Sequence, residues 1–316
     1  MDGVDPEGAG PGGEMMVGQD LAGAPRSVRI AAPAKINLTL AVLGNRPDGF
    51  HEIESVVVPV GLYDELVLTE ARGPDIHLAC DDPAVPDGEE NLVYRAAERL
   101  AEGAGDNHGV QIRLTKRIPV GAGLGGGSSD AAATLVGLNR LWQTGLSGSA
   151  LAEIGAGLGS DVPLFVRGGA AIIRGRGEQV ESIRLGWSGW IVLVVPRFGM
   201  STARVYRHWE PTERPPRSAG DVVEAARAGQ DLSELLYNML ESPAFAVEPR
   251  IAALHAKLIE LGATRARMSG SGSGLFALFG ESSQAEAFAA RVARQLETNV
   301  YVVRTTECEH QSWEHL

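Results

Sequence analysis

The segment from Pro119 to Ser129 combines residue types that suit a polyphosphate-binding loop. Five of the seven residues from Gly121 to Gly127 are glycine, and a helix is expected to follow over 129–142. Glycine lets the backbone approach a ligand closely, while free N–H groups and the dipole at a helix N-terminus attract anions. A plain connector, with Ser129 or Asp130 capping the helix, is the alternative. The candidate phosphate-binding residues are Pro119, Val120, Gly121, Ala122, Gly123, Leu124, Gly125, Gly126, Gly127, Ser128 and Ser129.

Two better-known phosphate loops need partner residues that this segment lacks. Gly121–Gly126 matches the dinucleotide pattern G-x-G-x-x-G, which should follow a strand directly and precede an acidic residue by ~20 positions. Here Thr115–Pro119 separates the loop from the preceding strand, and residues 141–146 contain no acid. A Walker loop needs Lys and then Ser or Thr after its last glycine, but Ser128 follows the glycines directly. Neither type of loop is expected.

Hydrophobic periodicity predicts interleaved strands and helices around this loop. Strands are expected over 28–43 with a break at 33–35, and over 53–60, 66–69, 76–79, 110–114, 170–173, 190–195, 265–268, 275–279 and 300–304. Helices are expected over 91–101, 129–142, 147–158, 220–228, 232–240, 248–261 and 283–297. Pro163 is expected to end helical structure. The order has no steady βαβ rhythm, which favours an α+β fold over one doubly wound sheet.

Length and charge limit the number of domains and the classes of partner. A chain of 316 residues suggests two domains. Its 28 basic and 40 acidic side chains give a formal net charge of −12, so neither nucleic acid nor an anionic membrane is an expected partner. Residues 1–25 are rich in Gly, Pro and Ala, which predicts a disordered tail rather than a secretory signal. No apolar run approaches the ~18 residues of a membrane span, and we expect a cytoplasmic protein.

Three short motifs, in a fixed order, resemble those of the GHMP small-molecule kinases. Ala32–Leu38 is similar to the first motif, Pro119–Ala133 to the second and Met268–Gly274 to the third. The resemblance implies a two-domain GHMP kinase fold of the α+β class, with the active site in the cleft between the domains. It implies an N-terminal ATP-binding domain over 27–188, similar to domain 2 of ribosomal protein S5, and a C-terminal substrate-side α+β domain over 189–310.

Further segments resemble one branch of that family, notably Arg46–His51 and Gly159–Phe165. The resemblance implies that ATP and Mg²⁺ are used to phosphorylate the 2-hydroxyl of a small-molecule substrate, a cytidine diphosphate sugar alcohol of the non-mevalonate isoprenoid pathway. Phe50 stands where this branch usually has Tyr, which keeps a ring for stacking but removes a hydroxyl. We expect a monomer or a weak homodimer.

Asp161 and Lys35 are the expected catalytic residues. The resemblance places the family's catalytic aspartate at Asp161, where it would accept the proton of the attacking hydroxyl. Lys35 stands between Ala34 and Ile36, an unusual place for a solvated charge. We expect it to pair with Asp161, keep that carboxylate ionised and stabilise the transferring phosphoryl group. The alternatives are a turn or helix cap for Asp161, and for Lys35 a side chain that reaches solvent from a strand edge.

The expected substrate contacts come from both halves of the chain. Phe50 and His51 resemble the family's cytosine-recognition residues, and Tyr206 is a second candidate ring for stacking; a core Phe and a surface His are the alternatives. The substrate-binding candidates are Asn37, Phe50, His51, Tyr206, Gly270, Gly272 and Gly274. No set of metal ligands is assigned. Mg²⁺ is expected to arrive with ATP, and Ser128 or Ser129 are candidate contacts for it.

Two other functions stay open on the sequence. Another GHMP kinase would act on a mevalonate-type substrate, homoserine or a sugar, although Gly49–His51 and Gly159–Asp161 argue against these acceptors. A non-catalytic protein of the same fold would bind a nucleotide or metabolite. The presence of both Lys35 and Asp161 argues against that second alternative.

Overall fold

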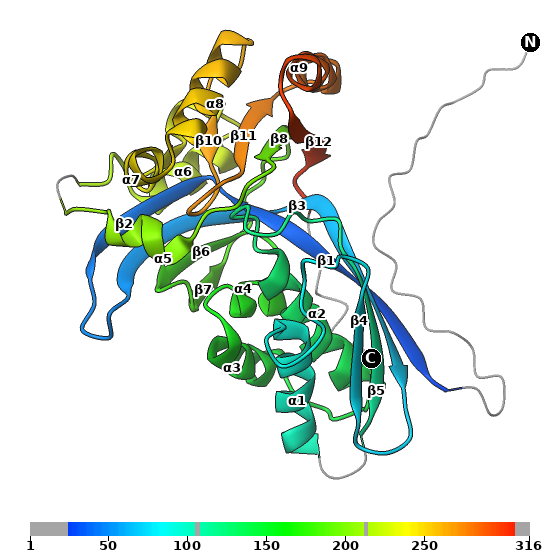
Figure 1. The fold of residues 1–316 in the computed structure, drawn as a ribbon. Coiled ribbons are helices and arrows are strands. Elements are labelled where there is room, and N and C mark those ends of the chain that lie inside the picture. The colour runs from blue at the N-terminus through cyan, green and yellow to red at the C-terminus, as the bar shows by residue number, and fades with distance from the viewer. Residues whose placement is uncertain (1–24, 105–107, 212–213, 307–316) are drawn as a thin grey trace, which may run out of the picture.

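The structure, a computed structural model, describes residues 25–104, 108–211 and 214–306. Two β-sheets with helices packed against them make up this part of the chain (Figure 1). The described residues leave out the tail predicted over 1–25, except for its last residue. They also leave out the last residues of the domain predicted over 189–310. None of the described helices is long and apolar enough to cross a membrane.

The larger sheet has eight strands and is organised around β3 (His51–Glu70). β3 pairs antiparallel with β1, β2, β5 and β6, while β4 pairs parallel with β5 and β9 pairs parallel with β2. The other strands of this sheet are β1 (Ser27–Asn37), β2 (Thr39–Asn45), β4 (Ile76–Cys80), β5 (Val110–Thr115), β6 (Ala171–Gly175), β7 (Gln179–Ser182) and β9 (Tyr237–Asn238).

Both long strands continue through positions where the sequence predicts an interruption. The break predicted at 33–35 is wrong: β1 is continuous, and its register against β3 shifts between Pro33 and Ala34. Proline has no N–H to donate, and an irregularity in register lets a strand pass it. β3 likewise joins the strands predicted over 53–60 and 66–69. As a result Lys35 lies within a continuous strand and is buried, with 5% of its surface exposed.

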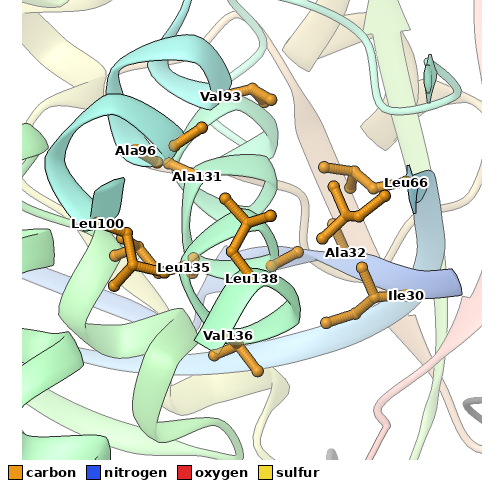
Figure 2. Packing of buried hydrophobic residues seen from close by; sticks show 14 of the residues in the cluster. Ile30, Ala32, Leu66, Val93, Ala96, Leu100, Ala131, Leu135, Val136 and Leu138 are labelled. Carbon is orange, nitrogen blue, oxygen red and sulfur yellow. The ribbon is translucent and has the colours of Figure 1, made fainter. Parts of the chain in front are cut away.

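Helices α1 to α4 lie together on one face of the larger sheet (Figure 1). Figure 2 shows α2 between the α1 side chains and the strand residues Ile30, Ala32 and Leu66. Leu135 and Leu138 of α2 are fully buried there, and each contributes about 1.5–3 kcal/mol to stability. This packing fixes α2 and therefore the glycine loop that leads into it. The four helices are α1 (Leu92–Ala104), α2 (Gly126–Leu141), α3 (Gly148–Leu158) and α4 (Val162–Arg167).

The smaller sheet has four antiparallel strands in the order β10-β11-β8-β12. Helix α9 packs on it through Phe288, which is fully buried. The strands are β8 (Trp190–Pro196), β10 (Arg267–Met268), β11 (Leu275–Phe279) and β12 (Thr298–Arg304). The helices of this half are α5 (Thr202–Arg207), α6 (Ala219–Arg227), α7 (Glu241–Val247), α8 (Pro249–Glu260) and α9 (Ser282–Gln295).

The two sheets share hydrophobic cores. One cluster joins Leu40 and Val42 of β2 to Val192 of β8, and another joins Ile36 of β1 to Leu193 of β8. Residues on either side of position 188 therefore pack directly on one another, which holds the functional groups of both halves in one arrangement. The domain boundary between residues 188 and 189 stays a prediction.

The helix predicted over 232–240 is wrong. A short 3₁₀ turn, Ser233–Leu235, is followed by β9. The Asn238 side chain donates to the carbonyls of Met268 and Gly270, both at 2.7 Å, while its backbone pairs with β2. These contacts with distant segments need an extended backbone, and they override the helical spacing of the leucines.

Pro163 starts a helix where the sequence predicts an end. It lies in the first turn of α4, where proline has no intrahelical hydrogen bond to lose and its φ suits the helix. The helix therefore begins directly after Asp161, and this residue occupies the N-cap position.

Candidate active site

Two glycine-rich loops, Gly121–Gly127 and Ser269–Gly274, lie against each other. The carbonyl groups of the first loop are occupied: Gly121 accepts from the Met200 N–H (3.3 Å), Ala122 from the Gly274 N–H (3.0 Å), Gly123 from the Ser269 hydroxyl (2.9 Å) and Leu124 from the Lys35 N–H (2.9 Å). In contrast, the N–H groups of residues 121–128 have no acceptor within the described part of the chain. With α2 beginning at Gly126, these N–H groups and the helix dipole form an arrangement suited to a polyphosphate.

The loop backbone requires glycine at specific positions. Gly121, Gly123 and Gly125 have φ values of 69°, 73° and 74°, in the left-handed region that side chains disfavour. A Cβ on Gly123 would lie 2.1 Å from the Ser269 carbonyl oxygen, and one on Gly125 would lie 2.8 Å from the Phe165 ring. The missing side chain at Gly123 lets the two loops approach each other, and the missing side chain at Gly125 makes room for Phe165.

The Gly123→Ala variant should therefore bind ATP more weakly. Its methyl group meets a backbone atom that cannot rotate away, so the two loops must separate. We expect the KM for ATP to rise at least about tenfold, with a loss of stability of about 1–3 kcal/mol. Gly157→Ala is the matched control, since Gly157 lies in α3 with open space around it and should gain stability instead. Initial-rate kinetics and urea unfolding of both variants measure this, and unchanged ATP kinetics in Gly123→Ala would contradict the assignment.

Lys35 and Asp161 lie together, as the sequence predicts. Lys35 Nζ is 3.7 Å from Asp161 Oδ2 and donates to Asn37 Oδ1 at 2.7 Å. Asp161 occupies the N-cap of α4, but its side chain makes no capping hydrogen bond. The capping alternative for Asp161 and the solvent-reaching alternative for Lys35 are therefore both wrong. The Asp161 side chain is 30% exposed, which leaves the carboxylate accessible to a ligand.

The burial of Lys35 affects its pKa. Desolvation lowers the pKa of the Lys35 ammonium group, and the nearby Asp161 carboxylate opposes this effect. Asn37 links Lys35 to the neighbouring strand, because Asn37 Oδ1 accepts from Lys35 and Asn37 Nδ2 donates to the Ser55 hydroxyl at 2.8 Å. Asn37 is only 2% exposed and orients Lys35 through this hydrogen bond; the predicted substrate contact at Asn37 stays a prediction.

The third-motif glycines differ in their surroundings. A Cβ on Gly270 would lie 3.4 Å from Lys35 Nζ, so this glycine borders the Lys35–Asp161 pair. A Cβ on Gly272 would meet the sulfur of Met268, and one on Gly274 would meet the Ala122 carbonyl. Gly270 thus lies beside Lys35, Gly272 makes room for Met268, and Gly274 lets the two loops approach; the predicted substrate contacts of all three stay predictions.

A group of aromatic rings lies near Asp161. The His51 ring is 4.9 Å from the Tyr206 ring and 5.5 Å from the Trp209 ring, measured between centroids. Burial lowers the pKa of the His51 imidazole. The pKa of the Tyr206 hydroxyl is raised above its ordinary value, mainly by burial and secondly by the charge of Asp161. Phe50 is 47% exposed and lies apart from this stack, with the Arg176 guanidinium over its ring. The exposed face of the Phe50 ring suits stacking with a planar base.

A buried ionic triad supports the start of α2. Lys116 Nζ contacts an Asp64 carboxylate oxygen and lies 2.7 Å from Asp130 Oδ2, and all three side chains are at most 6% exposed. Asp64 also accepts the Ile118 N–H at 2.8 Å. Burial raises the pKa of Asp130 to about 7, against the opposing charge of Lys116. The triad ties β3 to the segment that leads into the glycine loop.

The stability of the Asp130→Asn variant relative to the wild type should increase as the pH rises from about 4 to about 7. A carboxyl group with a raised pKa in the folded state costs stability once the pH passes its ordinary value of 3.8, and the cost is complete above about 7. The free energy of unfolding of the variant, relative to that of the wild type, should therefore increase between these limits and stay constant above them. Urea unfolding at pH 5 and pH 8 tests this, with the exposed Asp87→Asn as control. A relative stability that does not vary with pH would contradict the raised pKa.

Sequence reasoning missed several of these residues. Trp209 and Arg176 carry no motif, and only the fold brings them to the site. Asp64 and Lys116 had a signal that was available, since each is a charge within or next to an apolar strand. Ser129, a predicted phosphate or metal contact, is buried with its hydroxyl unpartnered among the described residues.

Comparison with known proteins agrees with this geometry. The family pattern described as GHMP kinases N terminal domain matches residues 91–169, and the pattern described as GHMP kinases C terminal matches residues 220–298. A 4-diphosphocytidyl-2-C-methyl-D-erythritol kinase from Pelotomaculum thermopropionicum is 46% identical over 277 residues, which cover 87% of this chain and 96% of that protein. One from Bacillus cereus is 43% identical over 257 residues, covering 81% and 89% of the two chains.

Solved structures also resemble this chain. A crystal structure of 4-(cytidine 5'-diphospho)-2C-methyl-D-erythritol kinase superposes with a TM-score of 0.76 at 35% identity, covering 88% of this chain and 99% of the other. Homoserine kinase from Cytophaga hutchinsonii superposes with a TM-score of 0.69 at 19% identity, covering 92% and 97%, which supports the fold alone. The expected two-domain α+β architecture is confirmed, and the chain belongs to the GHMP kinase family.

Proposed function

We infer that this chain transfers the γ-phosphoryl group of ATP to the 2-hydroxyl of 4-diphosphocytidyl-2-C-methyl-D-erythritol, a step of the non-mevalonate isoprenoid pathway. The observation that carries this proposal is the Lys35–Asp161 pair, with Nζ and Oδ2 3.7 Å apart next to the free N–H groups of the glycine loop. Relatives at 43–46% identity bear the name of this activity.

The residues suggest how the transfer proceeds. Asp161 accepts the proton of the attacking hydroxyl, and Lys35 stabilises the negative charge on the carboxylate and on the transferring phosphoryl group. The N–H groups of residues 121–128 hold the ATP phosphates in place. On the acceptor side, His51 and Tyr206 form one wall of a base site, and Phe50 offers an exposed ring for stacking.

Magnesium is expected as the ATP complex rather than as a resident ion. No group of three or more His, Cys, Asp or Glu side chains suited to a metal occurs in the described ranges. The unpartnered Ser129 hydroxyl and the half-buried Ser128 at the start of α2 fit a contact to such a complex. When bound with ATP, Mg²⁺ would neutralise part of the phosphate charge.

A coupled assay of ADP release with three acceptors tests the proposed reaction. With 4-diphosphocytidyl-2-C-methyl-D-erythritol the chain should turn over, and kcat/KM for mevalonate or homoserine should be at least about 10³-fold lower because the base site would be unfilled. Comparable turnover of mevalonate or homoserine would favour another member of the family. Binding of an ATP analogue without turnover of any acceptor would favour the non-catalytic alternative.

A further inference from the structure

Arg176 is placed by two weak contacts in the turn between β6 and β7. Its guanidinium carbon lies 5.1 Å from the centre of the Phe50 ring, and its Nη2 donates to the Ala156 carbonyl at 3.2 Å. The side chain is half-buried. These contacts orient the guanidinium group without neutralising its charge, because a ring face and a carbonyl carry only partial charges.

The charge of Arg176 has no ionic partner in the part of the chain that the structure describes. Arg174, two residues earlier, shows the usual arrangement for this acidic protein. It donates to Glu54 at 2.9 Å and to Glu181 at 2.7 Å. The Glu178 carboxylate accepts from the Arg176 backbone N–H at 2.7 Å, but no described carboxylate pairs with the guanidinium group, which therefore keeps donors available for an anion.

The location of this charge is set by its neighbours on either side. Phe50, against which Arg176 packs, directly precedes His51 and therefore lies on the base side of the proposed site. On the other side, a Cβ on Gly177 would lie 3.3 Å from Asp161 Oδ1, so the β6–β7 turn borders the proposed proton acceptor. Arg176 thus stands in a turn that contacts the Phe50 ring through its own guanidinium and borders Asp161 through the next residue, Gly177.

We propose that Arg176 binds the diphosphate group of the acceptor substrate. This inference rests on the proposed function. A substrate with its cytosine ring at Phe50 and His51 and its hydroxyl at Asp161 must place its diphosphate between them, where Arg176 offers a planar fork of donors. A charge-assisted hydrogen bond of this kind favours binding by about 10- to 100-fold.

Calorimetric titrations with cytidine and with CDP test this inference, because only CDP carries the diphosphate. A saturating non-hydrolysable ATP analogue keeps both ligands out of the glycine loop. In the wild type CDP should bind at least about tenfold more tightly than cytidine. In Arg176→Ala that ratio should fall close to one, while the affinity for cytidine changes little; Arg176→Lys should restore part of the ratio, since it keeps the charge but loses the fork.

Arg291→Ala is the matched control. Arg291 also lies over an aromatic ring, that of Phe288 at 5.7 Å, and donates to a carbonyl, that of Leu261 at 3.1 Å. Its removal deletes the same kinds of contact on α9 and should leave the ratio of the CDP and cytidine affinities unchanged. The KM for ATP should also stay unchanged in Arg176→Ala.

The possible outcomes separate the two proposals. A wild-type preference for CDP that persists in Arg176→Ala overturns the role of Arg176 and leaves the proposed function intact. A wild type that binds CDP no more tightly than cytidine would likewise overturn the role of Arg176 and leave the proposed function intact. A wild type that binds neither ligand overturns the cytidine-based substrate and the inference with it.

Discussion

The Asp161→Asn variant should lose about 10³-fold in kcat, with little change in the KM for ATP. Asparagine keeps the shape of the side chain but cannot accept the proton of the attacking hydroxyl, and general-base catalysis typically contributes 10²- to 10⁴-fold. Because the Asp161 side chain is 30% exposed and caps no helix N–H, its replacement should change the free energy of unfolding by less than about 1 kcal/mol.

Steady-state kinetics with both substrates varied, together with urea unfolding, measure these effects. Asp221→Asn serves as the control, since it removes an equal charge from the exposed start of α6. A kcat for Asp161→Asn within tenfold of the wild-type value would show that another group accepts the proton.

The Lys35→Met variant should lose about 10²- to 10³-fold in kcat while staying folded. Methionine fills nearly the same volume but carries no charge to stabilise the transferring phosphoryl group. Replacing a buried charge by an apolar side chain is often neutral or stabilising, although here Asn37 loses a hydrogen-bond donor. The free energy of unfolding should therefore stay within about 2 kcal/mol of the wild-type value.

The lowered pKa of Lys35 adds a pH signature to this variant. Folding disfavours the charged form of Lys35, so the wild type is destabilised at pH values below the lowered pKa of this residue. This destabilisation disappears as the pH rises toward 10.5. The stability of Lys35→Met relative to wild type should accordingly decrease as the pH rises through that range. Urea unfolding of both proteins at several alkaline pH values measures this; a difference that does not vary with pH, or a large loss of stability with activity retained, would contradict the account.

The sequence predicted those parts of the site whose chemistry follows from the residue types of one short segment. Glycines 121 to 127 imply a close backbone approach wherever the loop lies in the fold, and the structure shows them in contact with Ser269. Lys35 was recognisable because a charge stood between apolar neighbours of a strand. Its pairing with Asp161 came from the resemblance to the family, since no spacing along the chain relates the two residues.

The parts that the sequence did not reveal depend on contacts between distant segments. Lys116 meets Asp64, 52 residues away, only because β3 pairs with β5. Arg176 reaches Phe50 because β6 pairs with the start of β3. The helix predicted over 232–240 failed for the same reason, because extended pairing with β2 outweighs a local leucine pattern.

A crystal structure with a non-hydrolysable ATP analogue and 4-diphosphocytidyl-2-C-methyl-D-erythritol would test the assignment of the site most directly. The 2-hydroxyl of the acceptor should lie within about 2.6–3.2 Å of an Asp161 carboxylate oxygen, with the γ-phosphate of the analogue over the N–H groups of residues 121–128. An acceptor hydroxyl that faces a different carboxylate, or ATP phosphates bound away from this loop, would contradict it.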